Sequence, residues 1–238
     1  MAIGVGLMIA ATALVSRALG GERRADARRL AGSGLVYGVA VMGAVSLLLL
    51  PAIGPVLSLL GATGRTAEIA EDFLWIVVPS NAVMGFGMVA SGILRATGDA
   101  RRAMYVTLAG GVAAAVLDPL LIFGLDLGIT GAPIATVLSR LAMAAVGWHG
   151  LVVVHDIVAR PSLGAIRMDG RALSAIAVPA ILTNVATPAG NAWVTAALAP
   201  FGDSAVAGWA VIGRLVPLAF GALFALSGAV GPILGQNL

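Results

Sequence analysis

Apolar blocks of roughly 20 residues recur along the chain, and short charged or Gly/Pro-rich segments separate them. A helix rises about 1.5 Å per residue, so such a block is long enough to cross a hydrocarbon layer of about 30 Å. Hydrophobic residues make up 60% of the chain and charged residues 11%, with a mean hydropathy of +1.03, which differs strongly from a soluble domain. The chain is therefore predicted to be an all-α membrane protein.

The limits of the apolar blocks predict a polytopic bundle of about seven transmembrane helices. These are residues 2–19, 31–60, 73–94, 103–124, 131–154, 173–199 and 205–234. Pro51 and Pro55 are expected to kink or end the second helix near the far surface. Small residues four apart, such as Gly34 and Gly38, favour close packing between helices in lipid.

Arginine is distributed unevenly over the predicted loops. The loops form an Arg-rich set at 17–29, 95–102 and 159–171, and an acidic set at 61–72, 125–130 and 200–204. The first set holds eleven of the fourteen arginines, whereas the second holds Arg65 and five acids. By the positive-inside rule, the Arg-rich loops are predicted to be cytoplasmic in a multi-pass membrane protein. An odd number of spans with an outside start predicts that further chain precedes residue 1.

Several function classes are disfavoured by composition. The chain has no Cys and two His, so thiolate sites and His-rich metal cages are not expected, and no metal or cofactor is predicted. The arginines are spread over short loops without interleaved aromatic residues, so no nucleic-acid partner is expected. The paired acids, Ser/His sets or metal ligands that an intramembrane enzyme needs are not apparent in the predicted spans, so the protein is not expected to be an enzyme.

Asp118 is an acid inside an apolar block, followed at once by Pro119. An ionised carboxylate within a span is costly unless it is paired, hydrated or protonated, so a functional role is the first hypothesis. The structural alternative is an Asp that caps the kink at Pro119. Counted from the outer ends of their helices, Asp118 lies about 9 Å deep and Thr136 about 8 Å deep, so the two are predicted at matching depth.

Four motifs together resemble the multidrug and toxic compound extrusion (MATE) family. They are LRATGDARRAM at 94–104, LDPLLIFG at 117–124, GAPIATVLSR at 131–140 and GPILGQNL at 231–238. Within the family, the chain looks most similar to the prokaryotic branch typified by DNA-damage-inducible protein F. The resemblance implies two six-helix lobes related by pseudo-symmetry, of which this chain is expected to be a fragment covering spans two to eight of twelve.

The same resemblance implies the organisation and activity of the chain. Residues 1–158 are expected to form an amino-terminal lobe without its first span, 159–172 a cytoplasmic inter-lobe loop, and 173–238 the start of the carboxy-terminal lobe. The implied function is secondary active efflux of small organic, cationic or amphipathic compounds against H⁺ or Na⁺. Asp118 would couple ions, and Thr136 would line the cavity of the amino-terminal lobe. Ala114 stands where the branch commonly has Asn, which implies a thinner polar network around the acid.

Further polar residues lie inside predicted spans. Asn184 and Asn191 are seven residues apart and share a helix face, so they are candidates for lining the second lobe's cavity or for interhelical hydrogen bonds. Arg140 and Arg214 are interpreted as structural residues that pair with an acid or bond backbone carbonyls. Two alternatives to efflux remain: a lipid-linked saccharide flippase of the same superfamily, and a truncated fragment that does not transport.

Overall fold

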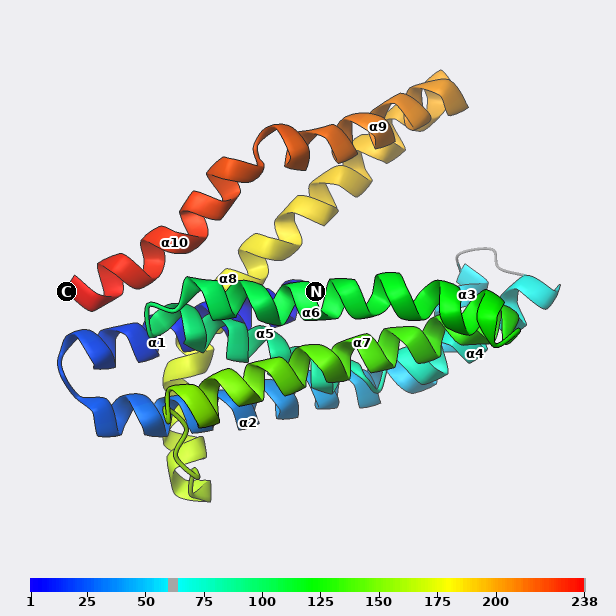
Figure 1. Ribbon diagram of the computed structural model, residues 1–238. Helices are drawn as coiled ribbons and strands as arrows, with labels where there is room; N and C mark the ends of the chain where they lie inside the picture. The colour runs from blue at the N-terminus through cyan, green and yellow to red at the C-terminus, as the bar shows by residue number, and fades with distance from the viewer. Residues whose placement is uncertain (60–63, 238) are drawn as a thin grey trace.

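The computed structural model describes residues 1–59 and 64–237, and the regular elements in these ranges are all helical (Figure 1). Five helices are long and apolar enough to cross a membrane, or six if α4 and α5 form one span with a 49° bend. The predicted class, an all-α membrane bundle, is confirmed.

The ten α-helices follow one another with short connections. They are α1 (Ala2–Gly20), α2 (Arg24–Leu49), α3 (Ile53–Leu59), α4 (Gly64–Val77), α5 (Asn81–Ala96), α6 (Ala100–Pro119), α7 (Gly131–Trp148), α8 (Leu163–Leu198), α9 (Asp203–Ala219) and α10 (Gly221–Asn237). A 3-10 turn at Leu50–Ala52 joins α2 to α3, and wider π-helical turns extend α6 to Gly124 and α7 to Val154. Pro51 therefore lies at the break expected near the end of the second span.

Helix α4 begins where the sequence predicts a loop and ends inside the predicted span 73–94. The charges of residues 64–72 predict an acidic turn, and residues 61–63 of that turn lie outside the described ranges. The structure forms a helix because Ile69, Phe73 and Ile76 recur at helical spacing and line one side, next to the 127–133 segment. Glu68 and Glu71 are exposed, so an amphipathic helix accommodates them.

Two other boundaries differ from prediction. Helix α8 begins ten residues earlier than expected, so residues 163–172 of the predicted inter-lobe loop are helical. The Ser162 hydroxyl accepts a hydrogen bond from the Ala165 amide (3.2 Å) at this start. The predicted single helix 205–234 is wrong, because the structure interrupts it at Phe220. Phe220 leaves the helical conformation (φ −107°, ψ 11°), and α10 starts at the next residue.

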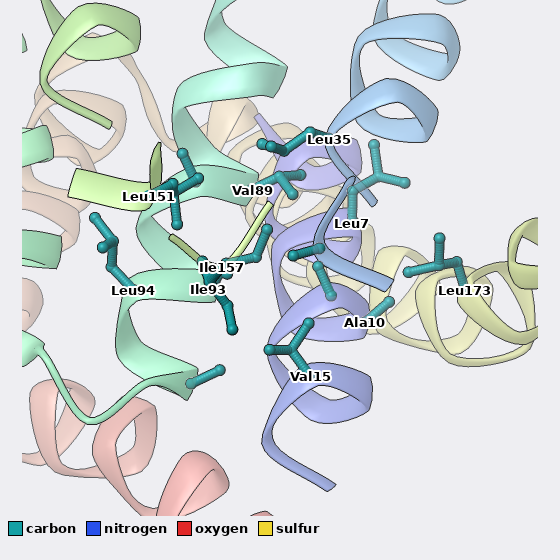
Figure 2. Packing of buried hydrophobic residues seen from close by; sticks show 14 of the residues in the cluster. Leu7, Ala10, Val15, Leu35, Val89, Ile93, Leu94, Leu151, Ile157 and Leu173 are labelled. Carbon is teal, nitrogen blue, oxygen red and sulfur yellow. The ribbon is translucent and has the colours of Figure 1, made fainter. Parts of the chain in front are cut away.

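The core is centred on α1, which packs against α2, α5, α8 and α10. Figure 2 shows the contact between Leu7, Ala10 and Val15 of α1 and apolar side chains of the neighbouring helices, namely Leu35, Val89, Ile93 and Leu173. Small residues permit this closeness: a Cβ added at Gly34 would lie 3.5 Å from Ala11, and one at Gly38 would lie 2.9 Å from Val89.

The carboxy-terminal helices form a long arm that meets the bundle at one end (Figure 1). Helix α8 crosses α1 and α2 and then leads away from the bundle, and α9 and α10 return alongside it so that the end of α10 reaches α1. We call the meeting place the Arg-rich end; it comprises the turns 21–23 and 97–99 and the segment 155–161. The opposite end comprises α3, α4, the loop 125–127 and the turn 199–202.

Candidate functional site

Asp118 lies on α6 and Thr136 on the antiparallel helix α7, both near the opposite end. A Cβ on Gly131 would lie 2.9 Å from the Leu121 backbone, which fixes the register of the two helices. By helical rise, Asp118 is about 5 Å and Thr136 about 8 Å inward from that contact. The two residues are therefore within one helical turn of each other in depth.

The side chains of these two residues are bonded differently. The Thr136 hydroxyl donates to the Ala132 carbonyl of its own helix (3.0 Å). Asp118 is half-buried, and within residues 1–59 and 64–237 its carboxylate has neither a hydrogen bond nor an ion pair. The structure thus leaves the carboxylate without a protein partner to neutralise it in the described part of the chain.

Asn184 and Asn191 lie on α8, away from the α6–α7 pair in the contact pattern. The Asn184 amide donates to the Ala180 carbonyl of the same helix (2.8 Å), and Asn191 is exposed. Helix α8 packs on α1 and α2, and no described hydrogen bond joins either Asn to Asp118 or Thr136. The four predicted site residues therefore form two separate pairs.

The Arg-rich end joins the first helices to α10. The Gln236 amide of α10 donates to the Ala96 carbonyl at the end of α5 (2.6 Å). A Cβ on Gly20 would overlap the Gln236 backbone, and one on Gly235 would lie 2.9 Å from the Ser16 side chain. Glycine at both positions therefore permits α10 to contact the end of α1 directly.

Helix α8 is attached to the first helices by a buried acid. Asp169 is 3% exposed, accepts a hydrogen bond from the Ser33 hydroxyl (2.7 Å) and lies 3.5 Å from the Arg29 guanidinium. One turn further on, the hydroxyls of Tyr37 and Ser174 are 2.6 Å apart. These side chains connect α2 to α8 through contacts of high sequence separation.

A second cluster of charges lies beside the α5–α6 turn. Asp99 caps α6 by accepting a hydrogen bond from the Arg102 amide (2.9 Å), and its carboxylate also contacts the Arg102 guanidinium and His155 Nε2. Burial alone would raise the pKa of Asp99, but the hydrogen bonds from Arg102 and His155 outweigh it and lower the pKa to about 2. The carboxylate is therefore ionised at neutral pH and holds the 155–157 segment to this turn.

A cavity of about 380 Å³ lies among α1, α5, α6 and α7. We call it the methionine cavity because Met1, Met8, Met84, Met88 and Met143 line it. Two arginines, Arg95 and Arg140, also line it, together with the hydroxyl residues Ser91, Thr107 and Ser139. Neither Asp118 nor Thr136 is among its lining residues.

Arg140 also bonds the break between α4 and α5. Its Nη1 donates to the Val77 carbonyl (2.8 Å) and to the Ser80 hydroxyl. This bond to a backbone carbonyl confirms the predicted structural role, because it satisfies an acceptor that the 49° bend leaves open. Arg214, by contrast, is exposed on α9.

The amino-terminal half of the chain, residues 1–120, matches the family model described as MatE. The chain belongs to the MatE family. MatE proteins are transporters rather than enzymes, as predicted from the motifs.

Named MatE relatives cover the whole chain. It is 33% identical to the FAD transporter of Shewanella oneidensis and 25% identical to the multidrug export protein MepA of Staphylococcus aureus, matching over 100% of its own length in each case. A crystal structure of a mutant of the Vibrio cholerae MATE transporter VcmN superposes with a TM-score of 0.91 at 30% identity, covering 99% of this chain and 54% of that one. The chain also covers 54% and 53% of the first two proteins, so it spans about half the length of these relatives.

Sequence reasoning missed three features of this MatE chain. The sequence places Arg95 in the predicted Arg-rich loop 95–102, whereas in the structure it ends α5 and lines the methionine cavity. Asp169 was counted as a loop residue, although its place one turn ahead of an apolar helix was a signal that it begins a helix. The methionines gave a partial signal, since Met84 and Met88 share a helix face.

Proposed function

We propose that the protein acts in secondary active export, in which a small organic compound leaves the cell while H⁺ or Na⁺ moves inward. The observation that supports this most directly is the arrangement of two sets of helices, the bundle α1–α7 and the carboxy-terminal arm α8–α10. They are in contact at the Arg-rich end, through α10 and the ends of α1 and α5, and they diverge toward the opposite end (Figure 1). Alternating access needs such an arrangement, with a contact that closes one end while the other end is apart.

The positive-inside rule orients the proposal. With the Arg-rich loops in the cytoplasm of a bacterial inner membrane, the contact between α1 and α10 lies on the inner side. The present arrangement would then be closed toward the cytoplasm and apart toward the outside. This is the state in which an exported compound is released.

Asp118 is the residue we propose for ion coupling. It is a half-buried carboxylate on a membrane-spanning helix, near the end that is apart, with no protein partner among the described residues. An ionised group in this position is costly, so binding of H⁺ or Na⁺ relieves the cost. Binding of the ion from outside would then change the charge of the lobe and favour the return of the helices.

The test is gradient-driven flux in proteoliposomes that contain the protein. Asp118→Asn should abolish export driven by a proton or sodium gradient, because the amide neither titrates nor carries charge. Asp118→Glu should restore part of it. Asp126→Asn is the matched control, since this exposed loop carboxylate lies near the same end.

A purely structural role for Asp118 predicts a different pattern. Asparagine and glutamate would then both change the thermal stability, and the pH dependence of any remaining flux would be that of the wild type. Unchanged flux in Asp118→Asn would remove this residue from the coupling mechanism.

A further inference from the structure

Another hollow of the bundle opens on its surface beside α2. Its volume of about 390 Å³ falls in the range of small-molecule sites, about 300–1,000 Å³. We call it the α2 groove; its walls come from the 32–40 stretch of α2, Phe86 of α5, Trp148 of α7 and residues 158–161. Val36 is 41% exposed and Val39 is 38% exposed, so the groove is open on its outer side.

The lining of the α2 groove is apolar with one exception, Arg160. Aliphatic side chains of α2 form one wall, and the rings of Phe86 and Trp148 form another, with their centroids 6.2 Å apart and a tilt of 40°. Such walls offer few hydrogen-bonding groups along the groove. The ligand that they favour is therefore a hydrocarbon chain.

The α2 groove has the depth of one lipid leaflet. From Gly32 to Ala40 it follows α2 for eight residues, which is about 12 Å at the helical rise. Half of a hydrocarbon layer of about 30 Å is about 15 Å. The groove begins beside the segment 158–161 of the Arg-rich end, so it extends from that surface toward the middle of the membrane. One acyl chain of a phospholipid fits this length.

The mouth of the groove is fixed in place on α2. The Ala159 amide donates to the Arg28 carbonyl (3.0 Å), so the backbone beside Arg160 is bonded to the helix. A Cβ on Gly32 would overlap the Ala159 carbonyl and would lie 3.3 Å from Pro161. Glycine thus lets both neighbours of Arg160 rest on α2, which holds this arginine at the mouth.

The charge at the mouth is positive and uncompensated. Arg160 is exposed, and among the described residues it takes part in no hydrogen bond or ion pair. Asp156, the acid of the same segment, is already paired with Arg28 (2.9 Å). Guanidinium donors match phosphate oxygens, and basic pockets at the cytoplasmic side of membrane helices bind anionic headgroups. The positive-inside rule orients the Arg-rich end toward that side.

We propose that the α2 groove binds an anionic phospholipid of the leaflet at the Arg-rich end. One acyl chain lies along α2 against Phe86 and Trp148, and the headgroup phosphate lies at Arg160. A zwitterionic choline headgroup binds less well, because its ammonium adds a second positive charge beside the arginine. The site is separate from Asp118 and from the methionine cavity, and its binding of lipid does not depend on export.

The test is quenching of tryptophan fluorescence by phospholipids that carry bromine on the acyl chain. A protein with Trp75→Phe, Trp193→Phe and Trp209→Phe keeps Trp148 as its only tryptophan. It is reconstituted in phosphatidylcholine vesicles with a rising fraction of brominated phosphatidylglycerol or brominated phosphatidylcholine. The dependence of quenching on this fraction gives the relative affinity of the two lipids. We expect phosphatidylglycerol to be favoured about fivefold, the size expected for one arginine at the membrane surface.

Trp75 provides the matched comparison site. It is 49% exposed, against 50% for Trp148, and it lies on α4 at the opposite end. A protein that keeps Trp75 as its only tryptophan should show no preference for phosphatidylglycerol. This comparison leaves Arg160 in place, so it tests the site even if a variant of that arginine fails to fold.

Substitutions then assign the preference to the mouth of the groove. In the protein that keeps Trp148, Arg160→Gln should reduce the preference to about one and leave quenching by phosphatidylcholine unchanged, because the apolar walls are intact. Arg160→Lys should retain most of the preference, since it keeps the charge. Arg167→Gln is the matched control, because this exposed arginine lies on α8 outside the groove.

Several results would overturn the proposal. Equal affinity of the two lipids at Trp148 would do so, as would an equal preference at Trp75 or an equal loss of preference in Arg160→Gln and Arg167→Gln. If neither lipid quenches Trp148, protein covers the groove and the lipid assignment is wrong. Because these measurements use no substrate and no gradient, their failure is distinguishable from a failure of Asp118-dependent export.

Discussion

The Arg-rich end and the opposite end of the molecule differ in the range of their side-chain hydrogen bonds. At the Arg-rich end, the bonds Ser33–Asp169, Arg28–Asp156 and Gln236–Ala96 join residues more than 100 positions apart. At the opposite end, the described bonds Ser58–Pro55, Trp75–Glu71 and Thr130–Leu127 join residues three or four positions apart, and the longer bond from Arg140 to Val77 stays within the bundle. Two of the bonds at the Arg-rich end join the bundle to α8 or α10, whereas none of the bonds named at the opposite end does. The arm can therefore separate from the bundle at the opposite end without losing a described hydrogen bond.

The Arg-rich end itself contains two kinds of attachment. Helix α8 is held by the buried Asp169, whose removal would leave the Ser33 hydroxyl without its acceptor and Arg29 with Asp26 as its remaining described partner. Helix α10 is held by one amide bond and by two glycine contacts. The α8 attachment is therefore expected to persist while the α10 attachment opens and closes.

The largest expected effect comes from a side chain placed between α1 and α10. A Cβ on Gly20 would overlap the Gln236 backbone, so Gly20→Val should force this contact open. The reporter is Ser16→Cys, because Ser16 is fully buried beside Gly235 and the chain has no other Cys. An overlap with backbone atoms costs about 3 kcal/mol or more, which opens the contact about a hundredfold more often, so maleimide labelling of the cysteine should accelerate at least about a hundredfold.

The control for this experiment lies toward the opposite end. Gly190→Val on α8 has open space around the added side chain and should leave the labelling rate of the Ser16→Cys protein unchanged. If both valine substitutions accelerated labelling, the opening of the α1–α10 contact would not depend on the side chain placed at Gly20, and the proposed difference between the two ends would be wrong.

A smaller effect is expected from the attachment of α8. Asp169→Ala should lower the free energy of unfolding by about 2 kcal/mol, because it removes a buried hydrogen bond to a charged group and leaves the Ser33 hydroxyl unsatisfied. Thermal unfolding in detergent measures this. Glu68→Ala, which removes an exposed acid on α4 at the opposite end, should stay within about 0.5 kcal/mol of wild type. Equal losses in both variants would contradict the asymmetry.

The difference between local and long-range contacts also explains which helices the sequence predicts. Helices α1 and α7 follow from the length of an apolar block: the predicted starts at residues 2 and 131 agree with Ala2 and Gly131. The start of α8 did not follow, because Asp169 is buried by Ser33 and Arg29, which lie more than 130 positions away. In the sequence, the charge of Asp169 favours a loop, whereas in the folded protein its distant partners allow it to be buried inside a helix.

The residues of the candidate site and of the methionine cavity also differ in how clearly the sequence identifies them. Asp118 stood out in the sequence because a charge within an apolar block is visible without knowledge of the neighbouring helices. Arg95 did not stand out, since a charge at the end of a block fits the positive-inside rule equally well. Its place in the methionine cavity depends on how α5 is rotated against α1 and α7, which is a property of tertiary packing.

The smallest expected effect concerns the charge of Asp99 at the Arg-rich end. Hydrogen bonds from Arg102 and His155 lower its pKa to about 2 against the burial that would raise it, whereas an unfolded Asp has a pKa of about 3.9. A lowered pKa contributes stability above the unfolded value, and this contribution is lost as the pH falls from about 4 to about 2. Wild type should therefore lose its stability advantage over Asp99→Asn in that window.

Asparagine is the matched replacement because it keeps the cap on the Arg102 amide and removes the charge alone. The free energies of unfolding of the two proteins, obtained from thermal unfolding, should differ at pH 6 by less than about 1 kcal/mol, since the pair is close to solvent, and should converge near pH 2. The free energy of unfolding of Asp126→Asn, a variant near the opposite end, should change with pH in the same way as that of wild type over this range. A difference that stays constant from pH 6 to pH 2 would show that the α5–α6 turn depends on the shape of residue 99 and not on its charge.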